Sequence, residues 1–208
     1  MPLSVMSHAS VSHFVPAVFL DRDGTLIEDN GSLRLPKQVV FYTSTVPTLR
    51  QLQEHFRLFI VTNQSGVAKG DLTLEEANQV NTHVVAWLHE RGVRINAVYC
   101  CPHRRQDNCA CIKPNPHFLL YAAHWHGLDL RRSFVIGDHP HDVELARNAG
   151  ATGVYVLTGH GVRHRAELSS EAMVAPDLAA AADWILGRIA DTAPQGFAKR
   201  RQTMKEPA

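Results

Sequence analysis

Two aspartates at the end of a short apolar run have the type and spacing to act together as a pair of catalytic acids. Asp21 directly follows the apolar stretch 17–20, and Asp23 directly precedes Gly24, where a turn is expected. One carboxylate can attack phosphorus and form an aspartyl-phosphate, which divides hydrolysis into two easier steps. A second carboxyl group can protonate the leaving oxygen and then activate water. The pattern therefore indicates paired catalytic acids, although Asp-Gly is also common in turns that follow strands.

Further polar residues follow other apolar runs along the chain. They are Thr62, Asn63 and Gln64 after the run 58–61, Asp138 after the run 133–137, and Lys113 beyond the run 95–100. Carboxylates at adjacent strand ends form an oxygen-rich site that suits Mg²⁺ beside a substrate phosphate. A lysine with hydroxyl and amide side chains can hold the other phosphoryl oxygens, where charge spreads in the transition state. The group therefore predicts magnesium-dependent phosphate chemistry.

The elements that must position these residues alternate between strands and helices. Apolar runs predict five buried strands, at residues 17–20, 58–61, 95–100, 133–137 and 153–157. Helices are expected at residues 46–54, 73–91, 115–126, 142–148 and 178–189, and a capping box of Thr73 and Glu76 opens the second. This alternation predicts an α/β fold, a doubly wound and mostly parallel sheet flanked by helices, without a large cap domain. The crevice outside the carboxyl ends of the strands then brings the polar residues together.

Length and composition fit one globular domain of 208 residues, with 45% hydrophobic and 20% charged residues. Lys and Arg number 21 and Asp and Glu number 20, so the chain has no basic surplus for nucleic acid. No apolar run reaches the roughly 18 residues of a membrane-spanning helix, and the N-terminus lacks a secretory pattern. We therefore expect a cytoplasmic monomer that acts on a small molecule and binds neither nucleic acid nor membrane.

The expected domain spans residues 15–190. Residues 1–14 read as a loose tail that precedes the first strand. Residues 191–208 are polar and basic without a helical or strand period, which is typical of a disordered tail.

The four cysteines cluster in one short loop between residues 100 and 111. A disulfide framework would spread them along the chain, so metal binding explains them better. Three thiolates and one imidazole suit a closed, structural Zn²⁺ site with Cys101, His103, Cys109 and Cys111 as ligands. Cys100 is the alternative if Cys101 is not a ligand, and a chance cluster of thiols is the alternative to any metal. A zinc ion in loop 101–111 would hold the segment that leads into Lys113.

Together these stretches resemble the four motifs of the haloacid dehalogenase-like phosphatase superfamily. The motifs are D-R-D-G-T at 21–25, T-N-Q-S-G at 62–66, Lys113, and G-D-H-P-H-D at 137–142. The resemblance covers residues 15–157 and implies Asp21 as the nucleophile and Asp23 as the general acid and base. It also implies that Asp21, the backbone carbonyl of Asp23, and Asp138 hold Mg²⁺. The implied phosphate-binding residues are Thr62, Asn63, Gln64 and Lys113.

The cysteine loop is similar to that of the zinc-containing, capless branch, whose members act on heptose bisphosphate or on histidinol phosphate. The stretch 62–70 looks like the heptose type, in which Lys69 would add a positive charge for the substrate. This similarity implies hydrolysis of the 7-phosphate of D-glycero-D-manno-heptose 1,7-bisphosphate. The chain departs from the branch where Ile112 replaces an arginine and His139 replaces a lysine. Isoleucine cannot make the bidentate phosphate contact of arginine.

Several alternatives stay open at this point. The same chemistry could serve histidinol phosphate or another small phosphomonoester. An acidic patch beside the zinc loop would favour histidinol phosphate, whereas basic groups would favour a bisphosphate. A non-catalytic, zinc-stabilised binding domain is the alternative from another class, but the retained Asp21 and Asp23 speak against it. Asp142 either supports Asp138 or caps a helix, and His139 and His141 either touch phosphate or belong to a solvated loop.

Overall fold

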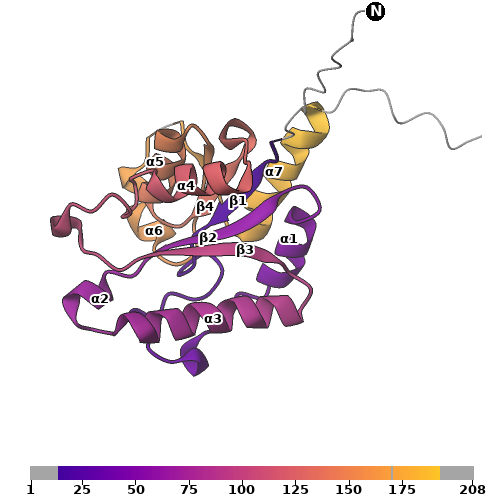
Figure 1. Ribbon diagram of the computed structural model, residues 1–208. Coiled ribbons are helices and arrows are strands. Elements are labelled where there is room, and N and C mark those ends of the chain that lie inside the picture. Colours follow the sequence, from indigo (N-terminus) through magenta and orange to yellow (C-terminus); the bar gives the residue numbers. More distant parts are fainter. Residues whose placement is uncertain (1–13, 170, 193–208) are drawn as a thin grey trace, which may run out of the picture.

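The computed structural model describes residues 14–169 and 171–192, and a six-stranded sheet runs through this part of the chain (Figure 1). The strands are β1 (Ala17–Leu20), β2 (Arg57–Asn63), β3 (Ile95–Cys101), β4 (Phe134–Gly137), β5 (Thr152–Val156) and β6 (Met173–Ala175). They are all parallel and lie in the order β3-β2-β1-β4-β5-β6. This is the order of a doubly wound sheet, so the predicted α/β fold class is confirmed.

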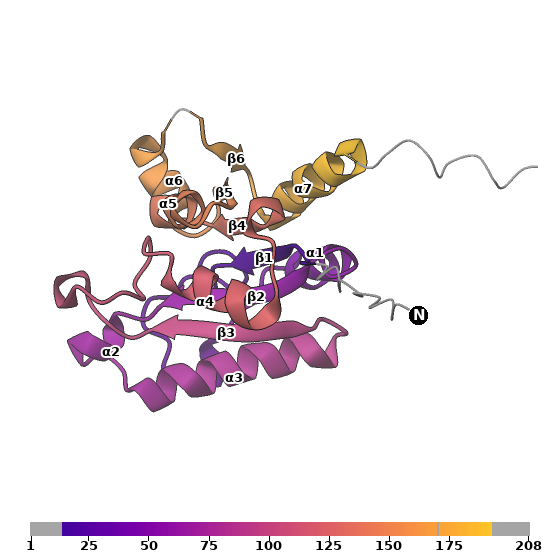
Figure 2. The ribbon, with the colours of Figure 1, turned by 45° about the horizontal axis from the view of Figure 1, so that its top comes forward.

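Helices cover both faces of the sheet, as Figures 1 and 2 show together. They are α1 (Thr45–Leu52), α2 (Gly66–Lys69), α3 (Leu74–Glu90), α4 (His117–His126), α5 (Pro140–Ala149), α6 (Gly161–His164) and α7 (Leu178–Thr192). Single turns of 3₁₀ helix are η1 (Pro36–Gln38), η2 (Arg105–Asp107), η3 (Leu130–Arg132) and η4 (Arg165–Glu167). The predicted capping box of α3 is present, since Thr73 Oγ1 accepts from the Glu76 N–H and the Glu76 carboxylate accepts from the Thr73 N–H.

The central strand β1 contributes to two separate hydrophobic cores. Val18 and Leu20 belong to the core beneath α1, α3 and α7, whereas Ala17 and Phe19 belong to the core beneath α4 and α5. Successive side chains of a strand point to opposite faces, so four apolar residues in a row suit a strand buried on both faces. All four are 0% exposed. Strand β1 is therefore a rigid support for whatever follows Leu20.

Strand register brings the functional segments to one edge of the sheet. Leu20 pairs with Ile60 of β2 on one side and with Ile136 of β4 on the other. The backbone N–H of Asp21 donates to the Ile136 carbonyl at 2.9 Å, which fixes the first residue beyond β1. Asp21, Thr62 and Asp138 therefore emerge side by side at the carboxyl edge.

Three sequence-based expectations need correction. All five predicted strands are present, but the structure has a sixth, β6, which is too short for an apolar run and depends on pairing with β5. Helix α5 begins at Pro140, and its N-cap is His139 rather than Asp142; Asp142 instead caps the helix from its third position, where its carboxylate accepts from the His139 N–H in a capping box. Helix α7 runs from Leu178 to Thr192 and so extends three residues beyond the predicted end at residue 189. The rest of the predicted tails, residues 1–13 and 193–208, lies outside the described residues.

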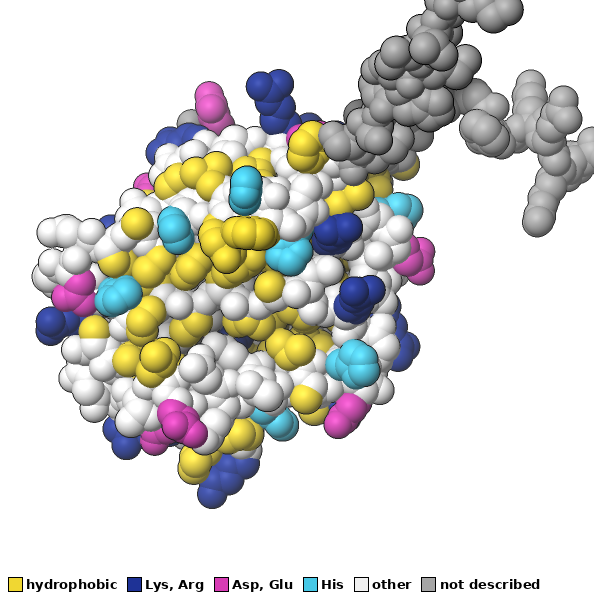
Figure 3. All heavy atoms as spheres, in the orientation of Figure 1, with side chains coloured by type: hydrophobic (Ala, Val, Ile, Leu, Met, Phe, Trp, Pro, Cys, Tyr) yellow, Lys and Arg dark blue, Asp and Glu magenta, His cyan; other side chains and the backbone are white. Residues whose placement is uncertain are grey.

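Figure 3 shows apolar side chains on the surface of the molecule. Leu120, Tyr121 and Trp125 of α4 are exposed. None of the helices in the described ranges is both long and apolar enough to cross a bilayer.

A buried hydroxyl ties the start of β1 to the loop before β4, and its removal should destabilise the fold. Ser133 is 0% exposed, and its Oγ accepts from the Ala17 N–H at 2.9 Å and donates to the Asp129 carbonyl at 2.6 Å. Ser133→Ala should lower the free energy of unfolding by about 1–3 kcal/mol, because a buried N–H loses its partner. Denaturant unfolding measures this loss. The exposed Ser169→Ala is the control, and an equal effect of both variants would contradict the explanation.

Candidate functional site

A cavity of about 420 Å³ opens at the carboxyl ends of β1, β2 and β4. Its lining includes every residue predicted for catalysis, phosphate or magnesium, namely Asp21, Asp23, Thr62, Asn63, Gln64, Lys69, Lys113 and Asp138. A larger groove of about 600 Å³ lies between α3 and β3, but none of these residues lines it. Chemistry rather than size therefore locates the candidate site.

Lys113 joins two buried carboxylates at the centre of the cavity. Its Nζ donates to Oδ1 of Asp21 at 2.5 Å and to Oδ1 of Asp142 at 2.7 Å. Burial alone would lower the pKa of Lys113, but the charges of Asp142 and Asp21 raise it above its ordinary value. Lys113 therefore stays protonated and fixes the carboxylate of Asp21 beyond the end of β1.

Asp138 sits in a close-fitting space between two glycines. Its Oδ2 accepts from the backbone N–H of His160 at 2.7 Å, and its side chain is 3% exposed. A Cβ atom at Gly24 or Gly159 would collide with this oxygen, and both glycines have a positive φ, 76° and 52°. Burial, together with the charge of Asp142, raises the pKa of Asp138 to about 6. The glycines in the first motif and after β5 are therefore needed for the position of this carboxylate.

The carboxylates form a site that a divalent cation fits. Asp21, Asp138 and Asp142 offer oxygens that all lie within 4.8 Å of one another. Burial raises the pKa of Asp21 well above its ordinary range, and nearby carboxylates raise it further against the effect of Lys113. Three buried acids beside one lysine leave a negative surplus, and Mg²⁺ prefers oxygen ligands. The group could therefore hold Mg²⁺.

Asp23 points to a different set of partners. The guanidinium of Arg22 donates to both of its carboxylate oxygens, with Nη2 2.8 Å from Oδ2 and Nε 3.2 Å from Oδ1. Arg22 is 0% exposed, and its Nη1 donates to Oδ1 of Asn81 on α3 at 2.6 Å. Gln64 Nε2 donates to Asp23 and to Thr62 Oγ1, both at 2.8 Å. The side chain of Asp23 therefore lines the cavity but is not part of the cluster formed by the carboxylates of Asp21, Asp138 and Asp142.

The segment after β4 contributes more than sequence reasoning assigned to it. Asp142 Oδ2 accepts from the His139 N–H at 3.1 Å, while its other oxygen holds Lys113. His139 and His141 are half-buried and line the cavity, with ring centroids 4.3 Å apart, so the solvated-loop interpretation is wrong. Burial and the neighbouring His141 lower the pKa of His139 to about 4, so this ring is neutral near neutral pH.

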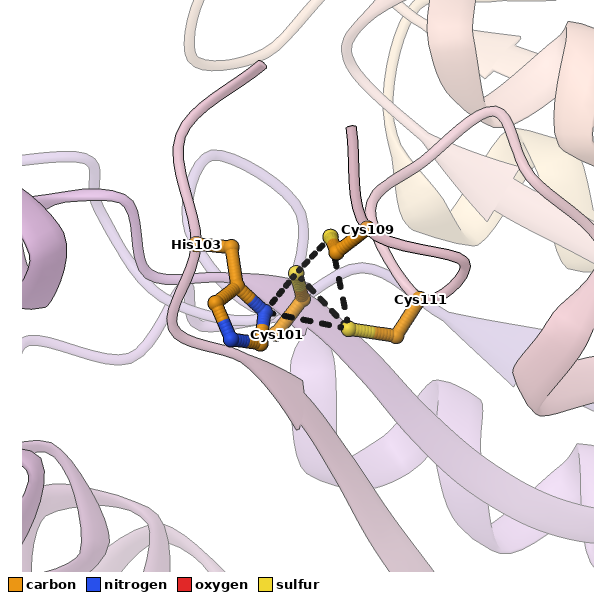
Figure 4. A group of neighbouring side chains, drawn as sticks. All are labelled: Cys101, His103, Cys109 and Cys111. Atoms are coloured by element: carbon orange, nitrogen blue, oxygen red, sulfur yellow. Dashed lines mark hydrogen bonds between the residues drawn. The ribbon is translucent and has the colours of Figure 1, made fainter. Parts of the chain in front are cut away.

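The cysteine loop forms a compact group of four possible metal ligands (Figure 4). Cys111 Sγ lies 3.2 Å from Cys101 Sγ, 3.6 Å from Cys109 Sγ and 3.4 Å from His103 Nδ1. A tetrahedral zinc with bonds of about 2.3 Å to sulfur and about 2.0 Å to nitrogen requires ligand separations of roughly 3.5–3.8 Å. The cluster could therefore bind zinc, and Cys100 lies outside it in β3.

Two buried positions of this site were missed from the sequence. Arg22 stands between the two aspartates. A charged residue just beyond a fully buried strand indicates that it is buried and paired with an acid or another polar group. Asn81 lies on the buried side of α3 with Ala77, Val84 and Leu88. A polar residue at a core position of an amphipathic helix suggests a buried hydrogen bond.

Known proteins match this chain over most of its length. The family model described as HAD-hydrolase-like matches residues 110–181. The D-glycero-beta-D-manno-heptose-1,7-bisphosphate 7-phosphatase of Escherichia coli K12 is 35% identical over 199 residues, which are 90% of this chain and 96% of that protein. The enzyme of the same name from Yersinia pestis is 36% identical and covers 85% and 93% of the two chains.

The fold has a close counterpart among solved structures. The heptose 1,7-bisphosphate phosphatase of B. bronchiseptica, solved in complex with magnesium and phosphate, is 29% identical and superposes with a TM-score of 0.77. The match covers 84% of this chain and 99% of that one. This chain belongs to the haloacid dehalogenase-like family of hydrolases, and within it to the phosphatases, which hydrolyse phosphoric monoesters.

Proposed function

We propose that the chain removes the 7-phosphate of D-glycero-D-manno-heptose 1,7-bisphosphate with the help of Mg²⁺. The observation that carries the proposal is the convergence of Asp21, Lys113 and Asp138 in one buried group at the carboxyl edge of the sheet. Relatives that are heptose 1,7-bisphosphate phosphatases support this choice of substrate. The small-molecule class of the substrate is also supported by the balance of 21 basic and 20 acidic residues.

In the proposed reaction the carboxylate of Asp21 attacks phosphorus, and the bond from phosphorus to the sugar oxygen breaks. Asp23 gives a proton to that leaving oxygen and later takes one from the water that releases phosphate from Asp21. Lys113, Thr62 and Asn63 hold the phosphoryl oxygens. Mg²⁺ held by Asp21, Asp138 and the backbone carbonyl of Asp23 would offset the negative charge of the phosphate.

Histidinol phosphate is the second candidate, and the mouth of the cavity favours the bisphosphate over it. Lys69 lines the cavity, and Arg105 contacts its wall at His141. The acid Asp29 also lines it, and its Oδ2 lies 3.4 Å from Nδ1 of His160. Basic groups at this mouth suit a second phosphate better than a cationic amine.

We further propose that residues 15–190 act as one domain, in which zinc holds loop 101–111 for a structural purpose. The four free cysteines suit a reducing compartment, which supports the proposed cytoplasmic location. We also propose that the protein is a monomer.

Replacement of the proposed nucleophile should abolish turnover without loss of the fold. Asp21→Asn keeps an oxygen that can accept from Lys113 but removes the attacking carboxylate, so phosphate release should fall by at least about 10³-fold. Phosphate release from heptose 1,7-bisphosphate measures this loss, with circular dichroism and zinc content as checks. The exposed Asp71→Asn should behave like the parent protein. Full activity of Asp21→Asn would exclude the covalent mechanism.

Zinc should depend on Cys109 and not on Cys100. Cys109→Ser should lose most bound zinc, because structural sites require all four ligands. Metal analysis of the purified protein gives the zinc per chain, and limited proteolysis reports whether loop 101–111 loosens. Cys100→Ser is the matched control and should keep its zinc. Equal zinc loss in both variants would contradict the ligand assignment.

Magnesium should stabilise the protein more at neutral than at acidic pH. Burial raises the pKa of Asp138 from an ordinary value of 3.8 to about 6. Because this folded-state pKa exceeds the unfolded value, the metal-free protein loses stability as pH rises through that window, by linkage. Mg²⁺ binds the ionised carboxylate and offsets the loss, so its increase in Tm should be larger at about pH 7.5 than at about pH 5. Asp138→Asn should show a small increase at both pH values, and a pH-independent shift in the parent protein would refute the assignment.

A further inference from the structure

The proposed substrate creates a second requirement, which rests on the function proposed above. A sugar bisphosphate carries another phosphate group far from the reacting one, and this group also needs positive partners. Five aspartates and two lysines line the cavity, and Lys113 is bonded to Asp21 and Asp142 and is assigned to the reacting phosphate, which leaves Lys69 as the lysine free for the second one. Ile112, at the position where the family has arginine, is 9% exposed and does not line the cavity.

Arg105 is exposed and does not itself line the cavity, but it contacts a residue that does. It belongs to η2 in the cysteine loop, yet its Nη2 lies 2.8 Å from Nε2 and 3.2 Å from Nδ1 of His141, which lines the cavity. The contact joins residues 36 positions apart and places a guanidinium against the cavity wall. His141 engages one nitrogen, whereas a guanidinium has five N–H donors, so donors remain for an anion.

The loop around Arg105 is fixed on both sides. Cys101 and His103 precede η2, Cys109 and Cys111 follow it, and the four form the zinc-type cluster. Within η2, the Asp107 carboxylate accepts from the Arg104 N–H at 2.8 Å. A side chain on a loop held in this way loses less conformational freedom when it binds a ligand.

We propose that Arg105, placed by His141, binds the second phosphate of the sugar bisphosphate and so selects this substrate over a monophosphate. An arginine fork matches phosphate oxygens in a bidentate manner, which is the contact that Ile112 cannot make. Arg105 thereby supplies, from a different point of the same loop, the contact absent at position 112.

The neighbouring Arg104 provides a matched control. It has the same charge and lies in the same loop, but its Nη2 points to Oδ1 of Asp107 at 3.5 Å rather than to the cavity wall. Lys69 is the competing cation, because it lines the cavity as well. Three single variants therefore separate the possible effects. Arg104→Ala tests the loss of a nearby charge, Arg105→Ala tests the proposed contact, and Lys69→Ala tests the competing cation.

The test compares heptose 1,7-bisphosphate with heptose 7-phosphate as substrates of the full-length protein with Mg²⁺. Arg105→Ala should raise KM for the bisphosphate at least about tenfold, the loss expected for one charge-assisted contact. It should leave kcat and the rates on the monophosphate nearly unchanged, and zinc content should stay at the parent level. Arg104→Ala should match the parent protein on both substrates.

The outcomes that overturn the proposal are distinct from failure of the proposed function. Parent protein that does not prefer the bisphosphate would remove the proposed function and the second-phosphate site together. A parent preference that survives in Arg105→Ala, or disappears only in Lys69→Ala, would remove the Arg105 site alone. An equal loss on both substrates in Arg105→Ala would assign the residue a structural role instead.

Discussion

Burial of three carboxylates around a single lysine is the constraint on which the rest of the site depends. Charged groups in a protein interior are costly unless they are paired and hydrogen-bonded. Lys113 meets two of the acids directly, and the third, Asp138, receives a backbone N–H. The remaining negative charge is what makes the site suited to a divalent cation and, through it, to a phosphate. The same imbalance that would destabilise an ordinary core is therefore the functional feature.

The fold meets this constraint with rigid elements rather than with many contacts. Strand β1 is buried on both faces and bonded to β2 and β4, so Asp21 begins from a fixed backbone position. Gly24 and Gly159 leave room for Asp138, and Gly137 leaves room for Asp142, where a Cβ atom would collide with the carboxylate. Small residues at these three points keep the carboxylates close without a rearrangement of the sheet.

Sequence patterns predict this arrangement in part, and the limit has a physical cause. Buried strands and the residues directly beyond them follow from local pattern, since parallel strands end at a common edge. Contacts between distant segments leave no such local signal. Three side-chain contacts join segments that are far apart in the sequence: Lys113 with Asp142, Arg22 with Asn81, and Arg105 with His141. Strand β6 is missed for the same reason, because three residues become a strand only through pairing with β5.

The cysteine loop connects the two halves of substrate recognition. Lys113, which we assign to the reacting phosphate, lies two residues beyond Cys111, and Arg105 lies between His103 and Cys109. A metal ion held by these four ligands would therefore set the position of both cations relative to each other. The separation of the two phosphates in a substrate is fixed by its covalent structure, so a loop of fixed shape can discriminate by distance as well as by charge. On this reasoning a bound zinc ion would do no chemistry on the substrate, yet it would determine which phosphate ester fits the carboxylates at the edge of the sheet.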